Sequence, residues 1–304
     1  MKPFNRWMVG LDFTATDDSL IEYVACLAHV LPPQKIYFVH VLTSFEVPEE
    51  MKRYLPGGKG PTRESIRRQL EARVRPHFDA EETTVVCEVY EGATNFELWR
   101  EAYRHDIDLF IAGSKPIGHG RGLLPQKFVR KSTCSVCFVP EHDVHPLRKI
   151  IVPTDFSEYA AKALNTAITI AQQQADCQLV CLHVYELPHA YYYNQFPRQQ
   201  YAELMERKAH NEYEQWIDNI DTKGMSIEPV FRLLEHPYVV DHLLKEAKAQ
   251  PVDLIVMGAG GHSLLSRIFL GSHVERMVGM EKSIPLMIVK DKARDIGIME
   301  IFTT

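Results

Sequence analysis

The sequence predicts an α/β protein made of two tandem domains, each built on a parallel sheet. The first observation is size, because 304 residues, 45% of them hydrophobic, can bury two ordinary cores. The second is that short apolar runs alternate with longer stretches of helical periodicity, which is typical of parallel α/β sheets. The third is a repeat: Val9-Gly10-Leu11-Asp12-Phe13 is matched 143 residues later by Val152-Pro153-Thr154-Asp155-Phe156.

The repeat continues in the same order along both halves. His40 has its counterpart 143 residues later at His183, each inside an expected strand. The apolar run from Asp108 to Gly113 matches the run from Asp253 to Gly258, at an offset of 145. Such matched segments indicate a duplicated domain. We expect domains over residues 1–142 and 147–290, a polar linker bounded by prolines at 140–146, and a C-terminal tail over 291–304.

Each expected element follows from local pattern. In the first domain, strands are predicted near 7–11, 35–42, 83–89, 108–112 and 135–139. The helix after the first strand is predicted to have Asp17, Asp18 or Ser19 as its cap, and two further helices are predicted over 62–78 and 94–105. In the second, strands are predicted near 149–153, 177–185, 226–233, 253–257 and 285–289, with helices after the N-cap Ser157 and over 198–220 and 272–280.

Composition narrows the class of function. The net charge of −6 gives no general attraction to nucleic acid or to anionic lipid. The chain has no run of 18 apolar residues and no signal-peptide core, so we expect a cytoplasmic protein. Cys134 and Cys137 have C-x-x-C spacing within an expected strand, which favours packed thiols over the alternative redox or zinc role.

One glycine pattern stands out as a candidate ligand loop. Gly258, at the end of an Asp-led apolar run, begins the spacing G-x2-G-x9-G-S, which ends at Gly271-Ser272. Glycines let a backbone approach a ligand closely, and a helix that starts near residue 272 would offer free N–H groups to phosphate oxygens. The pattern is neither a Walker loop nor G-x-G-x-x-G, and glycines alone more often mark a tight turn.

This spacing resembles the ATP-binding motif of the universal stress proteins. Support comes from Val152-Pro153-Thr154-Asp155-Phe156-Ser157, from Leu182-His183-Val184 and from Ile284-Pro285-Leu286-Met287-Ile288-Val289, and the resemblance covers both halves. It implies two five-stranded sheets of order 3-2-1-4-5, similar to the adenine nucleotide alpha hydrolases, which pair within the chain as a pseudo-dimer. It also implies ATP, AMP or ADP at the carboxyl ends of strands one and four, as the switch-point rule predicts, with Mg²⁺ held through the phosphates.

The family's functional positions carry over to the second domain. Asp155 would contact the ribose or adenine with Thr154 beside it, and Val184 would offer its backbone to the adenine. The phosphates would lie on Gly258, Gly261, Gly271 and Ser272. The full set expected at the nucleotide is Pro153, Thr154, Asp155, His183, Val184, Gly258, Gly260, Gly261, His262, Arg267, Gly271, Ser272 and His273. The alternative for Asp155 is a plain cap of the following turn.

Two departures from the family pattern matter. Where the family often has a basic residue between or just after the first two motif glycines, this chain has Ala259-Gly260 and His262, so phosphate affinity is expected to be lower or more dependent on pH unless Arg267 compensates. In the first domain, Pro116 replaces the second glycine and the loop to Gly122 is shorter and lacks the hydroxyl. We expect that copy to be structural, with Asp12 as a turn cap, and one nucleotide per chain.

Three functions fit these observations. The first is a nucleotide-binding stress or signalling protein that acts by binding, with its domains paired in one chain and with homodimers open as a further possibility. The second is a slow ATPase or related nucleotide-using enzyme, although we find no catalytic set of residues. The third is a structural interaction protein that binds no nucleotide.

Overall fold

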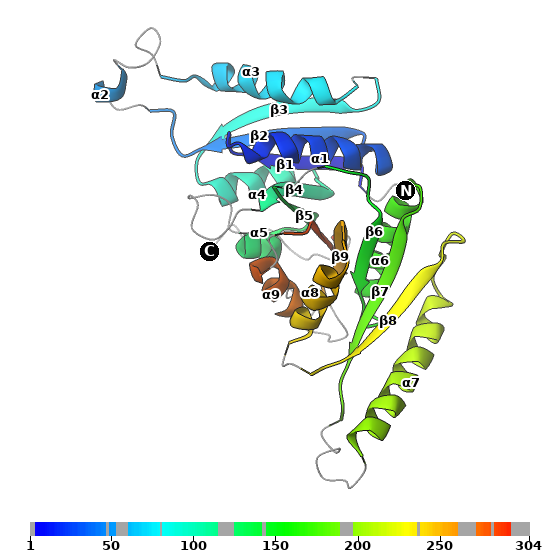
Figure 1. Cartoon of the computed structure of the whole chain (residues 1–304). Coiled ribbons are helices and arrows are strands. Elements are labelled where there is room, and N and C mark those ends of the chain that lie inside the picture. The colour runs from blue at the N-terminus through cyan, green and yellow to red at the C-terminus, as the bar shows by residue number, and fades with distance from the viewer. Residues whose placement is uncertain are drawn as a thin grey trace. The chain divides into compact units, whose positions relative to one another are not determined.

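A computed structural model of the chain describes residues 4–46, 49–52, 60–79, 81–114, 125–141, 144–188, 197–235, 238–260, 272–280 and 283–292 (Figure 1). The chain divides into two compact units, Met1–Val144 and His145–Thr304. Within the described residues, we find no helix with the length and hydrophobicity needed to cross a membrane.

The first unit contains a parallel sheet of order β3-β2-β1-β4-β5. In chain order its strands are β1 (Arg6–Leu11), β2 (Lys35–Leu42), β3 (Thr84–Glu91), β4 (Leu109–Ser114) and β5 (Ser135–Pro140). Its helices are α1 (Thr16–Val30), α2 (Glu49–Lys52), α3 (Arg63–Val74), the 3₁₀ turn η2 (Arg75–His77), α4 (Thr94–Arg104) and α5 (Pro125–Lys131). This is the predicted order 3-2-1-4-5.

The second unit repeats the plan with the order β8-β7-β6-β9-β10, all parallel. Its strands are β6 (Lys149–Pro153), β7 (Gln178–Tyr185), β8 (Ile227–Leu233), β9 (Leu254–Gly258) and β10 (Leu286–Val289). Its helices are α6 (Glu158–Ala171), α7 (Arg198–Ile217), α8 (Val239–Ala249) and α9 (Ser272–Met280). The predicted fold class is therefore confirmed in each unit.

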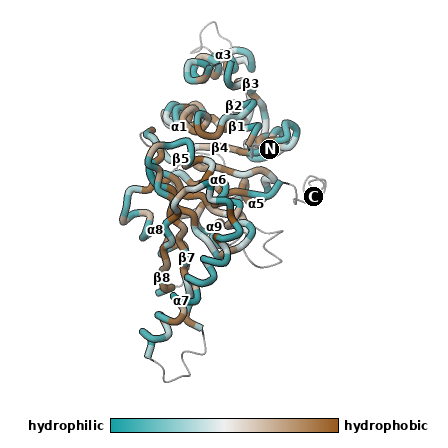
Figure 2. Tube along the Cα trace, turned by 90° about the vertical axis from the view of Figure 1, so that its right-hand side faces the viewer, coloured by the Kyte–Doolittle hydropathy of each residue, from teal (hydrophilic) through white to brown (hydrophobic). Residues whose placement is uncertain are grey.

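The strands form the core of each unit, because both faces of each sheet carry helices and apolar residues along the strands are buried. Helix α3 buries a stripe of Ile66, Leu70 and Val74 toward the sheet, at helical spacing. Figure 2 shows β7 in hydrophobic colours and α7 mostly in hydrophilic ones. That contrast agrees with the burial of α7, whose buried residues are Ala209 and Tyr213.

The aspartate that leads the fourth strand of each sheet is a structural residue. Asp108 Oδ2 accepts hydrogen bonds from the backbone N–H groups of Asn5 and Arg6, at 3.0 and 2.9 Å. Asp253 Oδ2 does the same for Arg148 and Lys149, at 2.6 and 2.8 Å. Both carboxylates lie at the amino ends of the strands. The leading Asp of the repeat therefore links the first strand of each sheet to the fourth, and in the second unit it lies at the opposite end of the strands from the candidate site.

The predicted cap of the first helix is wrong. Helix α1 begins at Thr16 after Ala15, which has no side chain that could cap it. Asp17 lies in the first turn of α1 and its carboxylate accepts from the backbone N–H groups of Asp12 and Phe13, at 3.3 and 2.7 Å. The local pattern predicts this carboxylate as a candidate cap of the helix. In the structure it instead binds the backbone of the turn that precedes the helix.

Candidate functional site

The predicted site residues that the structure describes gather at the carboxyl end of the second sheet. Strand β6 ends at Pro153 and β9 ends at Gly258, and these parallel strands are neighbours. On the other side of β6 lies β7, which carries His183 and Val184. Asp155, directly after β6, therefore stands between the ends of β7 and β9. This is the switch point of the sheet, where open α/β folds bind ligands.

The turn between β6 and α6 binds its own backbone. Thr154 Oγ1 accepts a hydrogen bond from the N–H of Phe156 at 3.0 Å, and Asp155 Oδ1 accepts from the N–H of Ser157 at 3.1 Å. Ser157 is the N-cap of α6, as predicted, and its hydroxyl oxygen accepts from the N–H of Ala160 at 3.2 Å. Asp155 thus has the capping role of the plain interpretation, and it is half-buried.

His183 is directed at the same turn. Its Nδ1 lies 2.8 Å from the carbonyl oxygen of Thr154, and because a carbonyl only accepts, Nδ1 carries the hydrogen. The first unit has the same contact, since His40 Nδ1 lies 2.8 Å from the carbonyl oxygen of Leu11. One ring nitrogen of His183 is therefore engaged by the backbone, which gives the repeated histidine a structural role in both units.

Sequence reasoning missed an aromatic cluster beside this turn. Phe156 has a φ of 63°, which is uncommon for a residue other than glycine, and its ring stacks on His183 with centroids 4.4 Å apart. Trp216 and Tyr213 of α7 also face Phe156, with centroids at 5.7 and 6.4 Å. Burial, and secondarily Cys181, raises the pKa of Tyr213, so its hydroxyl stays protonated.

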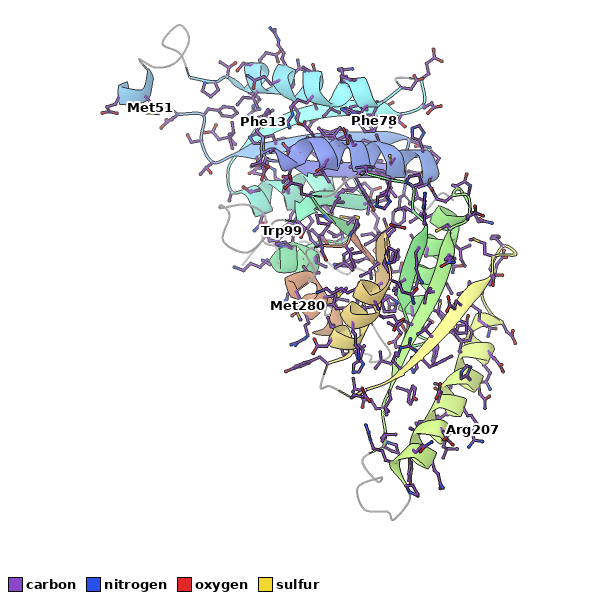
Figure 3. All side chains as sticks on the ribbon, in the orientation of Figure 1. Phe13, Met51, Phe78, Trp99, Arg207 and Met280 are labelled. Atoms are coloured by element: carbon purple, nitrogen blue, oxygen red, sulfur yellow. The ribbon has the colours of Figure 1, made fainter. Side chains whose placement is uncertain are left out.

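The signal for Phe156 was present in the repeat. Phe13, labelled in Figure 3, follows Asp12 as Phe156 follows Asp155, and it has a φ of 60°. Its ring contacts His40 edge-on, with centroids 4.6 Å apart. The repeated Asp-Phe pair therefore predicts a strained turn that packs on the histidine of the second strand.

Gly258 is required by packing. A Cβ at this position would lie 2.6 Å from the backbone carbon and oxygen of Tyr159, in the first turn of α6. The missing side chain lets the first turn of α6 approach the end of β9, so the positive end of this helix lies near the start of the glycine loop. At Gly113, the counterpart in the first unit, a Cβ would meet Leu20 Cδ2 at an ordinary 3.9 Å.

The rest of the loop is only partly described. Ala259 is buried, Gly260 is half-buried, and α9 begins at Ser272 with His273 exposed in its first turn, so the predicted helix start is confirmed. Gly261, His262, Arg267 and Gly271, together with the side chain of Ser272, lie outside the described residues.

In the first unit, a buried carboxylate binds the turn that corresponds to the turn between β6 and α6. Asp17, which is 3% exposed, occupies the position that the repeat gives to Ala160 in the second unit. Besides its two backbone contacts, it lies 3.4 Å from Arg73 Nη1, and Arg73 also pairs with Asp18 at 2.7 Å. Burial is the largest influence on the pKa of Asp17 and raises it above 3.8. The turn of the first unit therefore satisfies its donors internally.

Comparisons with known proteins agree with the repeat and the fold. Residues 146–290 match the model of the universal stress protein family. A universal stress protein of Methanocaldococcus jannaschii is 27% identical over 156 residues, which are 49% of this chain and 85% of that protein.

Two solved structures are similar in fold over almost the whole chain. One is a universal stress protein of Archaeoglobus fulgidus, with a TM-score of 0.59 and 16% identity, covering 94% of this chain and 98% of that one. The other is a Pseudomonas aeruginosa protein of unknown function, with a TM-score of 0.68 and 13% identity, covering 99% of this chain and 98% of that one. At such identities the likeness speaks for the fold alone.

Proposed function

Because residues 146–290 of this chain belong to the universal stress protein family, we propose that the second unit binds ATP or another adenine nucleotide and that the protein acts as a stress-response sensor or signalling protein. It would act by binding, with the first unit as a structural copy. The observation that carries the proposal is that Asp155 and Gly258 stand at the carboxyl ends of the paired strands β6 and β9, at the switch point of the second sheet.

The residues present fit such a ligand. The glycine loop begins at Gly258, beside the N-terminus of α6, and ends where α9 begins at Ser272. Helix N-termini attract phosphate oxygens through free N–H groups and the positive end of the helix dipole. Gly258, Gly261, Gly271 and Ser272 would hold the phosphates, and Mg²⁺ would enter through them.

The base and ribose would lie on the other side of Asp155. Val184, half-buried on β7, would offer its backbone to the adenine, and Thr154 and Asp155 would flank the ribose. His183 would act by holding the turn, since its Nδ1 is bonded to the Thr154 carbonyl. The stacked ring of Phe156 adds an apolar wall beside them.

Release of copurified nucleotide tests the proposal. The purified chain is denatured and the supernatant is analysed by mass spectrometry, and the nucleotide-free protein is titrated with ATP and Mg²⁺ in a calorimeter. We expect one nucleotide per chain. Asp155→Ala and Gly271→Val should weaken binding by at least about tenfold, or about 1.4 kcal/mol. Asp12→Ala, the matched change in the first unit, should leave it unaltered.

A further variant separates the two roles of Asp155. Asp155→Asn keeps an oxygen for the N–H of Ser157 but removes the charge, so binding that survives in Asn and fails in Ala assigns the effect to turn geometry. Absence of both copurified nucleotide and titration heat in the wild type would sink the proposal and leave the interaction protein. Phosphate release from the loaded protein decides between a sensor and a slow ATPase.

A further inference from the structure

We propose that the first unit binds a divalent transition-metal ion between β3 and the end of α4, with Glu88, Glu101 and His105 as ligands. Glu88 lies on β3, Glu101 lies in the last turns of α4, and His105 directly follows that helix. One ligand atom of each lies within 4.8 Å of the other two. Imidazole and carboxylate together suit Zn²⁺ and its neighbours in the first transition row.

The two distances from His105 to the carboxylates are those of a tetrahedral site. His105 Nε2 lies 3.6 Å from Glu88 Oε2 and 3.5 Å from Glu101 Oε2. Ligand atoms about 2.1 Å from a tetrahedral zinc ion lie about 3.4 Å from one another. An ion bound to His105 and either glutamate therefore needs only small movements of the side chains, and the two glutamate oxygens lie within 4.8 Å of each other.

The imidazole nitrogen provides an independent observation. His105 Nε2 is a buried atom without a hydrogen-bond partner among the described residues. Both oxygens that face it are carboxylate acceptors just beyond hydrogen-bonding distance. Buried polar atoms in native proteins are almost always satisfied, and a metal ion bound here would satisfy this nitrogen and both carboxylates together.

Glu101 is held in an orientation that leaves one oxygen for the ion. Its side chain is fully buried, and Arg100 Nε donates to Oε1 at 2.9 Å. The other oxygen, Oε2, faces His105, and its contact with Arg104 Nη1 is long, at 3.4 Å. Arg104 is largely exposed and can move aside, whereas Arg100 can stay as the outer partner that fixes the ligand.

The other two ligands also contact neighbouring side chains, although Tyr90 binds the same oxygen of Glu88 that faces His105. The hydroxyl of Tyr90 donates to Glu88 Oε2, and the ring of His105 stacks on Tyr37 of β2 with centroids 4.2 Å apart. Among the described residues, no lysine or arginine forms an ion pair with Glu88, and its contacts are with Tyr90 and His105. His105 and Glu88 are 22% and 30% exposed, so water can reach a fourth coordination position.

Zinc binding by the full-length chain tests the proposal. The protein is stripped with a chelator, and Zn²⁺ is titrated at pH 7.5 in a calorimeter. Loss of an outer partner alone weakens metal sites about 10–100-fold, so Glu88→Gln and His105→Gln should each weaken this site by at least about 100-fold. His77→Gln, which alters an exposed histidine of the same unit, is the control and should bind as the wild type does.

Two measurements keep the outcome independent of folding defects. Far-UV circular dichroism identifies variants that fold, and anomalous scattering at the zinc edge from crystals of the wild type locates the ion without any variant. A Co²⁺ spectrum without thiolate charge-transfer bands excludes the cysteines. An anomalous peak between β3 and α4 is expected. No peak there, or a zinc affinity of folded Glu88→Gln and His105→Gln equal to that of the wild type, overturns the proposal and leaves a proton on His105.

Discussion

Nδ1 of His183 lies 2.8 Å from the carbonyl oxygen of Thr154, so a side chain of β7 holds the turn that carries Asp155. The N–H of Thr154 in turn donates to the carbonyl oxygen of Leu182 at 2.9 Å. Strand β7 therefore binds both the N–H and the carbonyl oxygen of Thr154. A candidate binding residue is positioned by the neighbouring strand before any ligand arrives.

The tautomer of this histidine is a first prediction. Because Nδ1 must donate to the carbonyl, His183 and His40 should both show the Nδ1–H form in long-range ¹H–¹⁵N correlation spectra at a pH where the rings are neutral. Exposed His29 and His77 provide references in the same spectra. A Nε2–H form at His183 would contradict the contact.

Glycines 258 and 113 provide a matched pair for a second prediction. Gly258→Ala places a Cβ against the backbone of Tyr159, so it should lower the free energy of unfolding of the second unit by about 1–3 kcal/mol. Gly113→Ala meets Leu20 at an ordinary distance and should change stability by less than about 1 kcal/mol. Urea unfolding midpoints compare the two, and equal shifts would refute the packing argument.

The strands could be predicted because each depends on a local pattern, whereas their order was expected from the resemblance to the universal stress proteins. Apolar runs fix the strands, and predicted and observed strand ends differ by two residues at most; the repeat of Asp12 at Asp155 then makes one sheet serve as the template for the other. Helix α7 was also predictable, over 198–220 against the observed Arg198–Ile217.

Contacts set by the third dimension could not be predicted in this way. The pairing of His183 with the Thr154 carbonyl depends on strand register, and the left-handed φ of Phe156 depends on the turn being held from both sides. Glu101 and His105 are four residues apart on a helix and were readable as a pair. Glu88 joins them only because α4 packs on β2 and β3 pairs with β2, which no spacing encodes.

The buried carboxylate of Asp17 leads to a third prediction. Its pKa is raised above 3.8 by burial, and the backbone N–H groups and Arg73 offset this only in part. A raised pKa in the folded state favours folding below pH 3.8, and this contribution is lost as the pH rises through the folded-state pKa. The free energy of unfolding of the wild type, relative to Asp17→Asn, should therefore fall over that range and then level off.

Urea unfolding at a series of pH values from 3.5 to 7 measures that difference. Asp18→Asn is the matched control, because Asp18 pairs with the same arginine but its side chain is 70% exposed. A difference that rises with pH would show that Arg73 and the backbone donors dominate over burial.

The cysteines give a fourth prediction, which also tests the redox alternative for Cys134 and Cys137. Burial raises the pKa of Cys137 and of Cys181 to about 12, and the thiolate is the reactive form. Cys26 is exposed, although burial of its sulfur and Glu22 raise its pKa as well. Iodoacetamide should therefore label Cys26 first. It should label Cys137 and Cys181 on the order of 100-fold more slowly, because these two buried thiols react only when the sheet opens locally.

Peptide mass spectrometry at timed intervals follows each site, with urea-unfolded protein as the reference for full labelling. Rapid labelling of Cys137 in the folded chain, or a Cys134–Cys137 disulfide formed under mild oxidant, would show that these thiols are accessible and that packing is not their only role.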